Sequence, residues 1–468
     1  MRPAVPVDLT RDPGGELTSA HPMRRPVKSA LTPAEVLRAC RADVRPFCLT
    51  GEWAGGGALV GSDPVRVADP ELDDPFELLG AMPAIGPPRD GGPAGFVGGG
   101  WFGWLGYGLG RRIERLPDGP PRPHPLAPAG LAFHDHLLRW DRTTSTWWFE
   151  ALVTEERAAE LDRRFEVLRA RLAAAAPPIG HPWFGPFRSR PSRHDHLGAV
   201  TSTLSSIHAG DIYQANLCVR LEADVEGSLL DAFANAASAL APAYGAYVCD
   251  ANTEIASFSP ELFLRRHGRD VRSSPIKGTV RRDADLVAST HEREQLERSA
   301  KDRAENVMIV DLVRNDLGRV CRPGTVEVPD LARVEAHPGV WHLVSDVVGT
   351  LADGRDDGDL VRACFPPGSV TGAPKVRAME IIAATEATGR EVYTGAIGYA
   401  SPVAGLELNV AIRTFERTGD RVWFGVGGGV VVDSTPEGEW AECLVKAEPL
   451  LRAVGADLDE PVAAAGAR

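Results

Sequence analysis

Residues 398–431 read GYASPVAGLELNVAIRTFERTGDRVWFGVGGGVV, and this stretch decides the fold class. Apolar and polar residues alternate from Leu406 to Ile412, as they do in a strand with one buried face. Two turn signals, Pro402 to Gly405 and Thr418 to Asp420, separate the runs and predict antiparallel strands. Helical patterns occur elsewhere without a strict strand–helix–strand rhythm. The sequence therefore predicts an α+β (mixed α/β) fold with a large antiparallel share.

The flanking sequence predicts how the chain is divided. Alanine-rich sequence runs into prolines and a glycine near residue 180, which predicts a boundary between an N-terminal subdomain, residues 26–180, and a larger domain, residues 181–455. Residues 1–25 are rich in proline, glycine and charge, and residues 456–468 read the same way. Both ends are therefore predicted to be disordered tails.

Composition excludes several classes of partner. The 468 residues include 51 Lys and Arg against 64 Asp and Glu, a net charge of −13. This acidic balance argues against nucleic acid and anionic membranes as partners. No apolar stretch approaches the roughly 18 residues that span a bilayer, and the N-terminus lacks the apolar core of a signal peptide. The seven cysteines are scattered without a CxxC pair, which favours a reducing cytoplasm.

Two acidic helices stand out as candidate ligand sites. Glu305 lies at helical spacing with Met308 and Ile309, so its carboxylate falls on an apolar face and needs a cation. The alternative is a salt bridge in the core. In the second helix, which begins after Thr435, Glu439 and Glu442 share one face with Lys446. The alternative there is a solvated Glu–Lys pair. Together these carboxylates predict a partly hydrated Mg²⁺ site.

A lysine and a glycine run are the other unusual features. Lys277 lies between Ile276 and Gly278, where burial and a nearby Mg²⁺ would lower its pKa and favour a nucleophilic amine. The alternative is a strand-end lysine that reaches water. Residues 425–429 read GVGGG, which is no dinucleotide fingerprint but lets the backbone approach an anion closely. Arg413, on the polar side of its strand, either clamps a carboxylate or pairs with Glu407.

Two His-Asp-His triplets, residues 134–136 and 194–196, suggest a metal at first sight. No further histidine or cysteine has suitable spacing. We therefore predict that these histidines are structural or lie on the surface.

Taken in order, the motifs resemble those of the chorismate-utilising enzymes, which include anthranilate synthase component I, aminodeoxychorismate synthase component I and the isochorismate and salicylate synthases. The similarity is strong from about residue 202 to 451. It is carried by IHAGDIYQANL, FSPELF, PIKGT, KDRAENVMIVDLVRNDLG, HLVSDVVG, FPPGSVTGAPK, YTGAIGY, NVAIRT and GVGGGVVVDSTPEGEWAE. The resemblance implies an anthranilate synthase component I-like fold, with antiparallel sheets packed as a sandwich and helices outside. Residues 181–455 would form the chorismate-binding catalytic domain.

Small differences within this family select the reaction. Lysine in PIKGT is typical of aminodeoxychorismate synthases, whereas anthranilate synthases typically have alanine there, so Lys277 implies amination at C4 of chorismate. Isochorismate-type enzymes place a water-activating lysine where this chain has Gln214. Residues 241–244 also depart from the Asn-Pro-Ser-Pro-Tyr pattern of anthranilate synthases, which argues against tryptophan feedback there. Anthranilate synthase component I remains the alternative.

The resemblance also implies roles for individual residues. Lys277 would attack C2, Glu261 would protonate the leaving C4 hydroxyl, and His342 matches the family's active-site histidine. A purely electrostatic role for Lys277 stays open. Glu305 and Glu442, with Glu439 close by, match the Mg²⁺ ligands. The residues that match chorismate contacts are Gln214, Thr371, Tyr393, Arg413, Gly427, Gly429 and Lys446.

The resemblance finally implies a partner. Amination needs ammonia, and a glutaminase would show a Gly-x-Cys-x-Gly elbow, which none of the seven cysteines has. A separate glutamine amidotransferase subunit would therefore supply ammonia. The product, 4-amino-4-deoxychorismate, would lie on the route to 4-aminobenzoate, for folate or a specialised metabolite.

Overall fold

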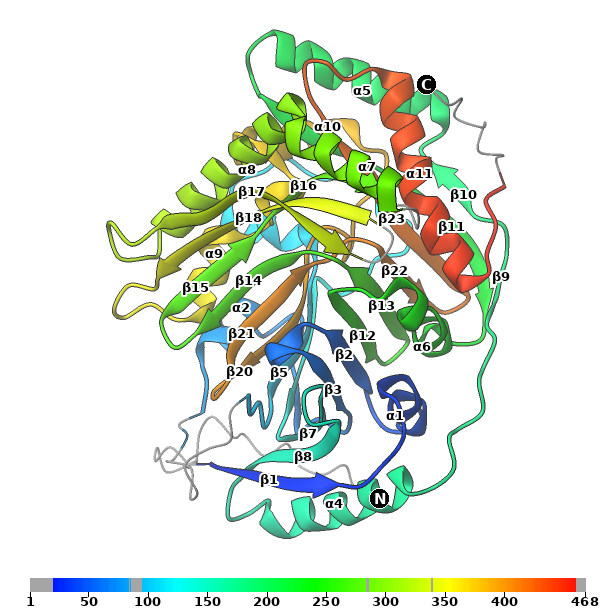
Figure 1. Ribbon diagram of the computed structural model, residues 1–468, viewed down its shortest axis with the longest axis vertical. Helices are drawn as coiled ribbons and strands as arrows, with labels where there is room; N and C mark the ends of the chain where they lie inside the picture. Colours follow the sequence, from blue (N-terminus) through cyan, green and yellow to red (C-terminus); the bar gives the residue numbers. More distant parts are fainter. Residues whose placement is uncertain (1–19, 84, 86–94, 283–285, 338–339, 460–468) are drawn as a thin grey trace.

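The computed structural model describes residues 20–83, 85, 95–282, 286–337 and 340–459 (Figure 1). Within these ranges the named strands form two sheets, and every neighbouring pair of strands is antiparallel. Helices account for much of the remaining chain. The predicted α+β class with a large antiparallel share is confirmed.

The first sheet has 13 strands, in the order β1 (His21–Val27), β8 (Thr146–Val153), β7 (His136–Asp141), β3 (Gly57–Gly61), β2 (Phe47–Gly51), β12 (Tyr244–Asp250), β13 (Thr253–Ser259), β22 (Thr414–Thr418), β23 (Arg421–Val430), β11 (Gln214–Glu226) and β10 (Arg188–Arg190), with β9 (Trp183–Phe184) and β19 (Gly372–Ala373) also paired to β11. The second has ten, in the order β16 (Ile276–Arg281), β18 (Val340–Thr350), β15 (Asp270–Ser274), β14 (Leu262–His267), β21 (Gly405–Val410), β20 (Ala396–Ser401), β5 (Gly100–Leu105), β6 (Ala129–His134) and β4 (Arg66–Val67), with β17 (Glu327–His337) paired to β18.

The two sheets pack face to face. Phe47 on β2 of the first sheet stacks on Phe102 on β5 of the second, with ring centroids 4.2 Å apart. Trp53, Trp104 and Trp423 belong to the same buried cluster. Large aromatic side chains from both inner faces therefore fill the space between the sheets, as in a sandwich. The predicted sandwich is confirmed.

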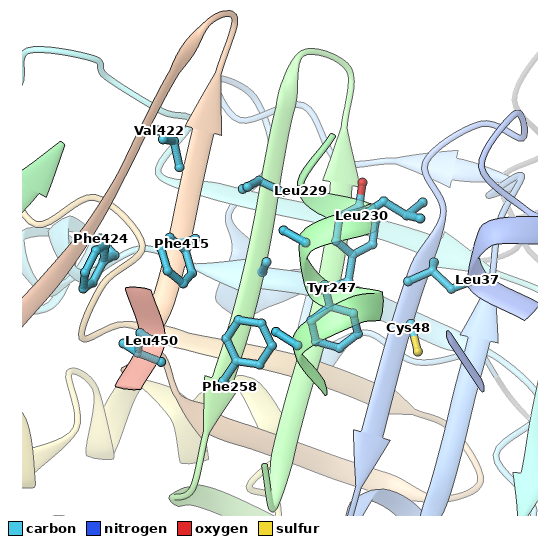
Figure 2. Close-up of a cluster of buried hydrophobic side chains, with 14 of the residues drawn as sticks. Leu37, Cys48, Leu229, Leu230, Tyr247, Phe258, Phe415, Val422, Phe424 and Leu450 are labelled. Atoms are coloured by element: carbon cyan, nitrogen blue, oxygen red, sulfur yellow. The ribbon is translucent and has the colours of Figure 1, made fainter. Parts of the chain in front are cut away.

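Helices cover the outer faces of the sandwich. Those named here are α1 (Pro33–Ala39), α2 (Pro75–Gly80), α3 (Gly110–Ile113), α4 (Ala158–Leu172), α5 (Arg193–His208), α6 (Leu229–Leu240), α7 (Leu286–Arg298), α8 (Ala300–Gly318), α9 (Asp357–Cys364), α10 (Lys375–Thr385) and α11 (Pro436–Val454). Figure 2 shows the core under the first sheet, where Leu37 of α1, Leu230 of α6 and Leu450 of α11 pack near Tyr247 and Phe258. A separate cluster lies between the second sheet and helices that include α8 and α9. None of the helices described is both long and apolar enough to cross a membrane.

The stretch 398–431 forms two hairpins, as predicted, but they belong to different sheets. Strands β20 and β21 lie in the second sheet, and β22 and β23 lie in the first. The alternating pattern predicted one strand through Arg413, and this is wrong. The strand ends at Val410, and Arg413 has a left-handed backbone with φ of 52°. The reason is that the chain turns there to pass from one sheet to the other.

Part of each predicted tail is ordered in the described structure. Residues 21–25 belong to β1. This strand pairs with β8, so its backbone hydrogen bonds are made to that strand. At the other end Ala456 is buried, and the backbones of Asp457 and Asp459 bond to Phe187. Residues 1–19 and 460–468 lie outside the described residues. The division at residue 180 stays a prediction. Each sheet contains strands from both sides of it, with the strands that precede residue 180 grouped at one end of the strand order.

Candidate active site

Two crossings between the sheets lie side by side and carry two of the predicted site residues. Glu261 lies between β13 of the first sheet and β14 of the second, and Arg413 lies between β21 and β22. The crossings are bonded together, since the N–H of Val410 donates to the carbonyl of Glu261 at 3.0 Å and the N–H of Phe258 donates to that of Arg413 at 2.9 Å. The backbone of both sheets therefore fixes this acid and this cation next to each other.

The Glu261 carboxyl is fully enclosed. Burial raises its pKa to about 7, against a hydrogen bond from Ser369 and the charges of Lys277 and Arg413. Burial also lowers the pKa of Arg413, against the charge of Glu261. The alternative pairing of Arg413 with Glu407 is wrong, because Glu407 forms its ion pair with Arg265. Among the described residues no carboxylate forms a salt bridge with Arg413, so its guanidinium is available to a ligand.

Lys277 lies in strand β16, and its side chain and that of Gln214 both approach the glycine run at Gly429. A Cβ atom built on Gly429 would lie 2.6 Å from Nε2 of Gln214 and 3.3 Å from Nζ of Lys277. Glycine is thus required here for space rather than for backbone freedom. Burial lowers the pKa of Lys277, against the attraction of Glu305 and with the help of Lys446. The predicted direction of this pKa shift is confirmed.

The glycine run presents its backbone to the same space. Strand β22 pairs with β23 only as far as Phe424, so the remainder of β23 has an open edge on that side. The carbonyl of Gly427 accepts a hydrogen bond from Nζ of Lys446 at 2.8 Å instead of from a strand. Since the N–H and C=O of one residue in an antiparallel strand point to the same side, the N–H groups of Gly427 and Gly429 also face this edge.

Two of the three predicted metal ligands, Glu439 and Glu442, lie on the other face of β23, whereas Glu305 lies near both Lys277 and Glu442. A Cβ built on Gly428 would lie 2.5 Å from Oε2 of Glu439 and 3.3 Å from Oε1 of Glu442. Burial raises the pKa of Glu439 and of Glu305. Burial acts in the same sense on Glu442, but Lys446 at 2.7 Å outweighs it and lowers the pKa. Glu305 also lies 3.9 Å from Lys301.

This donor set fits magnesium better than a transition metal. All three groups are carboxylates, the hard oxygen ligands that Mg²⁺ prefers. In the part of the chain that the structure describes, no three acidic, histidine or cysteine side chains converge tightly enough to enclose an ion. Mg²⁺ needs no such cage, because it keeps several waters and takes further oxygens from substrate.

Two buried side chains at the site have polar atoms without a partner. Both amide atoms of Gln214 and Nε2 of His342 are buried and unbonded within the described structure. His342, on β18, shares a 2.8 Å hydrogen bond between its Nδ1 and Oγ1 of Thr279. Burial, with the charge of Arg413, lowers the pKa of His342 to about 3, so the ring is neutral. Unpaired buried polar atoms in a native fold point to a missing ligand or water.

Thr371 and Tyr393 form the back of the site. The Thr371 hydroxyl donates to the carbonyls of Pro367 and Gly368, each at 3.2 Å. The Tyr393 ring lies over Gly425, where a Cβ would come within 2.2 Å of it. The hydroxyl of Tyr393 bonds to the thiol of Cys218, and burial raises its pKa well above the ordinary value.

Sequence reasoning missed the residues that hold these groups. Ser369 bonds to Glu261, and Thr279 bonds to His342. Arg390 is buried, and its Nη atoms donate to the carbonyls of Asn216 at 2.5 Å and Val370 at 2.9 Å. Ser369 and Thr279 lie inside motifs that the sequence did single out. Arg390 gave no usable signal, because its neighbours Glu386, Thr388 and Glu391 make the segment polar.

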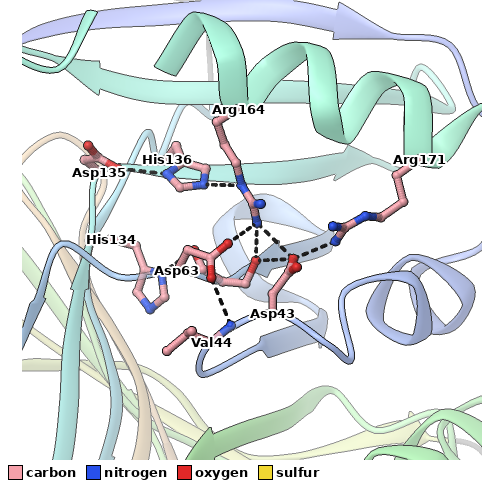
Figure 3. Close-up of polar contacts among 9 residues, drawn as sticks. Asp43, Val44, Asp63, His134, Asp135, His136, Arg164 and Arg171 are labelled. Atoms are coloured by element: carbon pink, nitrogen blue, oxygen red, sulfur yellow. Dashed lines mark hydrogen bonds and ion pairs between the residues drawn. The ribbon is translucent and has the colours of Figure 1, made fainter. Parts of the chain in front are cut away.

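The two His-Asp-His triplets are not part of this site. Figure 3 shows His136, whose Nδ1 bonds to Asp135 at 2.8 Å while its Nε2 accepts from Arg164 at 3.2 Å. Arg164 also contacts Asp43, so this network ties α4 to the first sheet. In the second triplet His194 is exposed and His196 is buried against Trp440. The prediction of structural or surface histidines is confirmed.

The chain is similar to known proteins in sequence and in fold. Residues 69–452 match the profile of a chorismate binding enzyme. The aminodeoxychorismate synthase component 1 of Salmonella typhimurium is 36% identical over 390 residues, covering 82% of this chain and 84% of that protein. The anthranilate synthase component 1 1 of Haloarcula marismortui is 37% identical over 370 residues, covering 76% of each. Anthranilate synthase component I from Streptococcus pneumoniae shares the fold, with a TM-score of 0.70 at 24% identity and coverage of 96% of this chain and 95% of that chain. Because the family match spans most of its length, the chain belongs to the chorismate binding enzymes.

Proposed function

We propose that this protein aminates chorismate at C4 and releases 4-amino-4-deoxychorismate, as the first component of an aminodeoxychorismate synthase. The observation that carries the proposal is Lys277, whose Nζ lies beside Gln214 and the glycine run with its pKa lowered by burial. Overall identity does not separate the two amination reactions, because relatives named for each are equally similar. The residue at position 277 does separate them, since anthranilate synthases typically carry alanine there.

The proposed reaction has two displacement steps. The neutral amine of Lys277 attacks C2, the ring double bond shifts, and the C4 hydroxyl leaves as water after Glu261 gives it a proton. Ammonia then attacks C4, the double bond shifts back, and the bond between C2 and Nζ breaks. The balance is chorismate plus ammonia to 4-amino-4-deoxychorismate plus water, with net retention at C4. Glu261 suits the acid's role because a pKa of about 7 leaves it substantially protonated at neutral pH.

The other side chains bind and orient the substrate. Arg413 and Lys446 are the cations for its carboxylates, the N–H groups of Gly427 and Gly429 add hydrogen bonds, and Gln214 has two free amide atoms for the ring. Neutral His342 would act through Nε2 as a hydrogen-bonding group rather than as a source of protons. Mg²⁺, held by Glu305, Glu439 and Glu442, would neutralise the ring carboxylate. Thr371 and Tyr393 support the wall behind the ring.

Product analysis tests the reaction. The protein is incubated with chorismate, MgCl₂ and ammonium, and the products are separated. We expect 4-amino-4-deoxychorismate. Anthranilate as the sole product would overturn the proposal in favour of the alternative.

The covalent role of Lys277 needs its own test. We expect Lys277→Ala to lower kcat by at least a hundredfold while the thermal unfolding curve is unchanged. Lys301→Ala is the matched control, since Lys301 is an exposed lysine that also lies near Glu305 and should leave kcat within a factor of two. Near-normal turnover by Lys277→Ala would show that the step through Nζ is wrong.

We also propose a separate glutamine amidotransferase as the source of ammonia, and the cytoplasm as the site of action. The seven cysteines are all free and none lies in a glutaminase elbow, which supports both points. The purified chain should use ammonium but not glutamine. Product formed from glutamine alone would contradict the need for a partner.

A further inference from the structure

A pocket of about 180 Å³ lies between α10 and the segment that follows α3. It lies behind the back of the proposed chorismate site, which Thr371 and Tyr393 form. Apolar side chains form much of its lining, among them Leu116, Met379 and Ile382. None of the residues assigned above to chorismate or Mg²⁺ lines it. A cavity of this size holds a single six-membered ring with a small substituent.

The charges around the pocket favour an anion. Three arginines and two glutamates line it, and each glutamate is already paired. Glu386 lies 2.7 Å from Arg390, and Glu391 bonds to Arg122 at 2.7 Å. Arg111 at the rim donates to the carbonyl of Pro117 and has no carboxylate partner among the described residues. One cation is therefore left over for a ligand.

A buried hydroxyl in the same lining also lacks a partner. The Tyr107 hydroxyl is buried and makes no hydrogen bond within the described structure. Its ring stacks under the guanidinium of Arg390, whose Cζ is 4.6 Å from the ring centroid. That hydroxyl has almost no accessible surface, so it lies behind the surface of the lining and does not face the pocket. The pocket itself offers an apolar slot and one arginine without a carboxylate partner among the described residues.

We propose that this pocket is a second ligand site for a small ring-bearing monocarboxylate of about the size of benzoate. The ring fills the apolar slot, and the carboxylate faces Arg111. Because Arg390 forms part of the lining and also holds the carbonyls of Asn216 and Val370, an occupant acts on strand β11, which carries Gln214, and on the short helix η3 (Gly368–Val370), which precedes Thr371. Binding here therefore changes the affinity for chorismate, a consequence that rests on the proposed function.

Direct binding tests the site without any turnover. Benzoate is the probe, and benzamide, its neutral analogue, is the control, each titrated into the full-length protein by ligand-observed NMR. We expect benzamide to bind about tenfold more weakly than benzoate, and Arg111→Gln to weaken benzoate by a similar factor. Arg112→Gln is the matched control, because Arg112 is the next residue but lies outside the lining, and it should bind benzoate normally.

Two further variants locate the ligand. Ala383→Phe fills the pocket from α10 and should abolish benzoate binding, with circular dichroism melting to verify the fold. Arg413→Gln, in the chorismate site, should leave benzoate binding intact. Loss of binding in Arg413→Gln but not in Ala383→Phe would place benzoate in the chorismate site and overturn the proposal. Equal affinity for benzoate and benzamide would also overturn it.

Kinetics test the coupling separately. Saturating benzoate should change KM for chorismate at least twofold in the wild type and in Arg112→Gln, and should have no effect in Ala383→Phe. Benzoate that binds without changing KM would refute the coupling. Failure to aminate chorismate at all would refute the proposed function, while the binding result would still decide whether the pocket is a site.

Discussion

Burial acts on Glu261 and His342 in opposite senses and favours the neutral form of each group. It raises the pKa of the carboxyl to about 7 and lowers that of the imidazole to about 3. Desolvation disfavours whichever form is charged, so an acid gains a proton and a base loses one. In the proposed mechanism, the carboxyl is therefore the group that supplies the proton to the leaving hydroxyl at neutral pH. The sequence could nominate both residues, but only their burial distinguishes their roles.

The raised pKa of Glu261 has a consequence for stability. A carboxyl whose folded pKa lies above its unfolded value stabilises the fold less as pH rises from about 4.5 to 7. The rise of this pKa to about 7 corresponds to roughly 3 kcal/mol of stability lost over that pH range. Glu261→Gln, which cannot ionise, should gain stability relative to wild type between pH 5 and pH 8, while its turnover falls sharply. Urea unfolding of both proteins at pH 5 and pH 8 measures this. An equal difference in the free energy of unfolding between Glu261→Gln and wild type at the two pH values would contradict it.

The pH dependence of activity should follow the ionisation of Glu261 as well. With Glu261 as the acid, kcat of the wild type should decline as pH rises through about 7, because the protonated carboxyl is lost. The pH profile of kcat with saturating chorismate and a constant concentration of free ammonia measures the decline. A flat profile from pH 6 to 9 would exclude Glu261 as the proton donor.

Neighbouring glycines on opposite faces of β23 should fail in different ways. Gly429→Ala places a methyl group 2.6 Å from the Gln214 amide, so KM for chorismate should rise at least tenfold at saturating Mg²⁺. Gly428→Ala places one 2.5 Å from Glu439, so the Mg²⁺ requirement should rise instead. Steady-state kinetics at varied chorismate and varied Mg²⁺ separate the two. The same defect in both variants would refute the assignment of the two faces.

At the scale of elements, the start of α11 connects helix capping with the metal ligands. Thr435 caps the helix by accepting from the N–H of Gly438, as the sequence predicts. The preceding hydroxyl, Ser434, instead donates to Oε1 of Glu439 at 2.6 Å. The cap could be predicted because it depends on residues three apart. The Ser434 contact could not, because it depends on how the chain leaves β23.

Removal of each of these two adjacent hydroxyl groups should therefore have a different effect. Thr435→Ala should lower the free energy of unfolding by about 1 kcal/mol and leave Mg²⁺ affinity unchanged. Ser434→Ala should weaken Mg²⁺ binding about tenfold or more, because supporting hydrogen bonds orient metal ligands. Denaturant unfolding and Mg²⁺ titration of each variant make the comparison. Weakened Mg²⁺ binding in Thr435→Ala alone would contradict it.

At the scale of the whole molecule, an acidic protein must bind a dianion. The net charge is −13, and the site adds three carboxylates that face Lys277 and Lys446. The local cations and the proposed Mg²⁺ would reverse the sign of the field that the substrate meets. The sequence could predict the fold class, and its motifs could nominate the site residues, whose roles stay predictions. It could not predict the sheet crossings at Glu261 and Arg413, because a crossing depends on pairing between distant strands.

Removal of the metal should therefore abolish substrate binding. Calorimetric titration of chorismate should show no binding in EDTA and recover with Mg²⁺. Mg²⁺ alone should raise Tm, because it binds the folded state and relieves repulsion between the carboxylates. Glu442→Gln should lose most of this rise, whereas Glu437→Gln, an exposed residue one turn earlier in the same helix, should keep it. Equal chorismate affinity with and without Mg²⁺ would contradict this account.

The pairing of an early strand with a late one in the first sheet also sets an order of events during synthesis. Strand β2 ends at Gly51, and its neighbour β12 begins at Tyr244. At about 5–20 residues per second, the ribosome takes roughly 10–40 s to make the intervening chain. Throughout that time β2 has one side without its native neighbour. The open side of a strand is where wrong pairing begins, so the nascent N-terminal half is the part of this protein most in need of a chaperone.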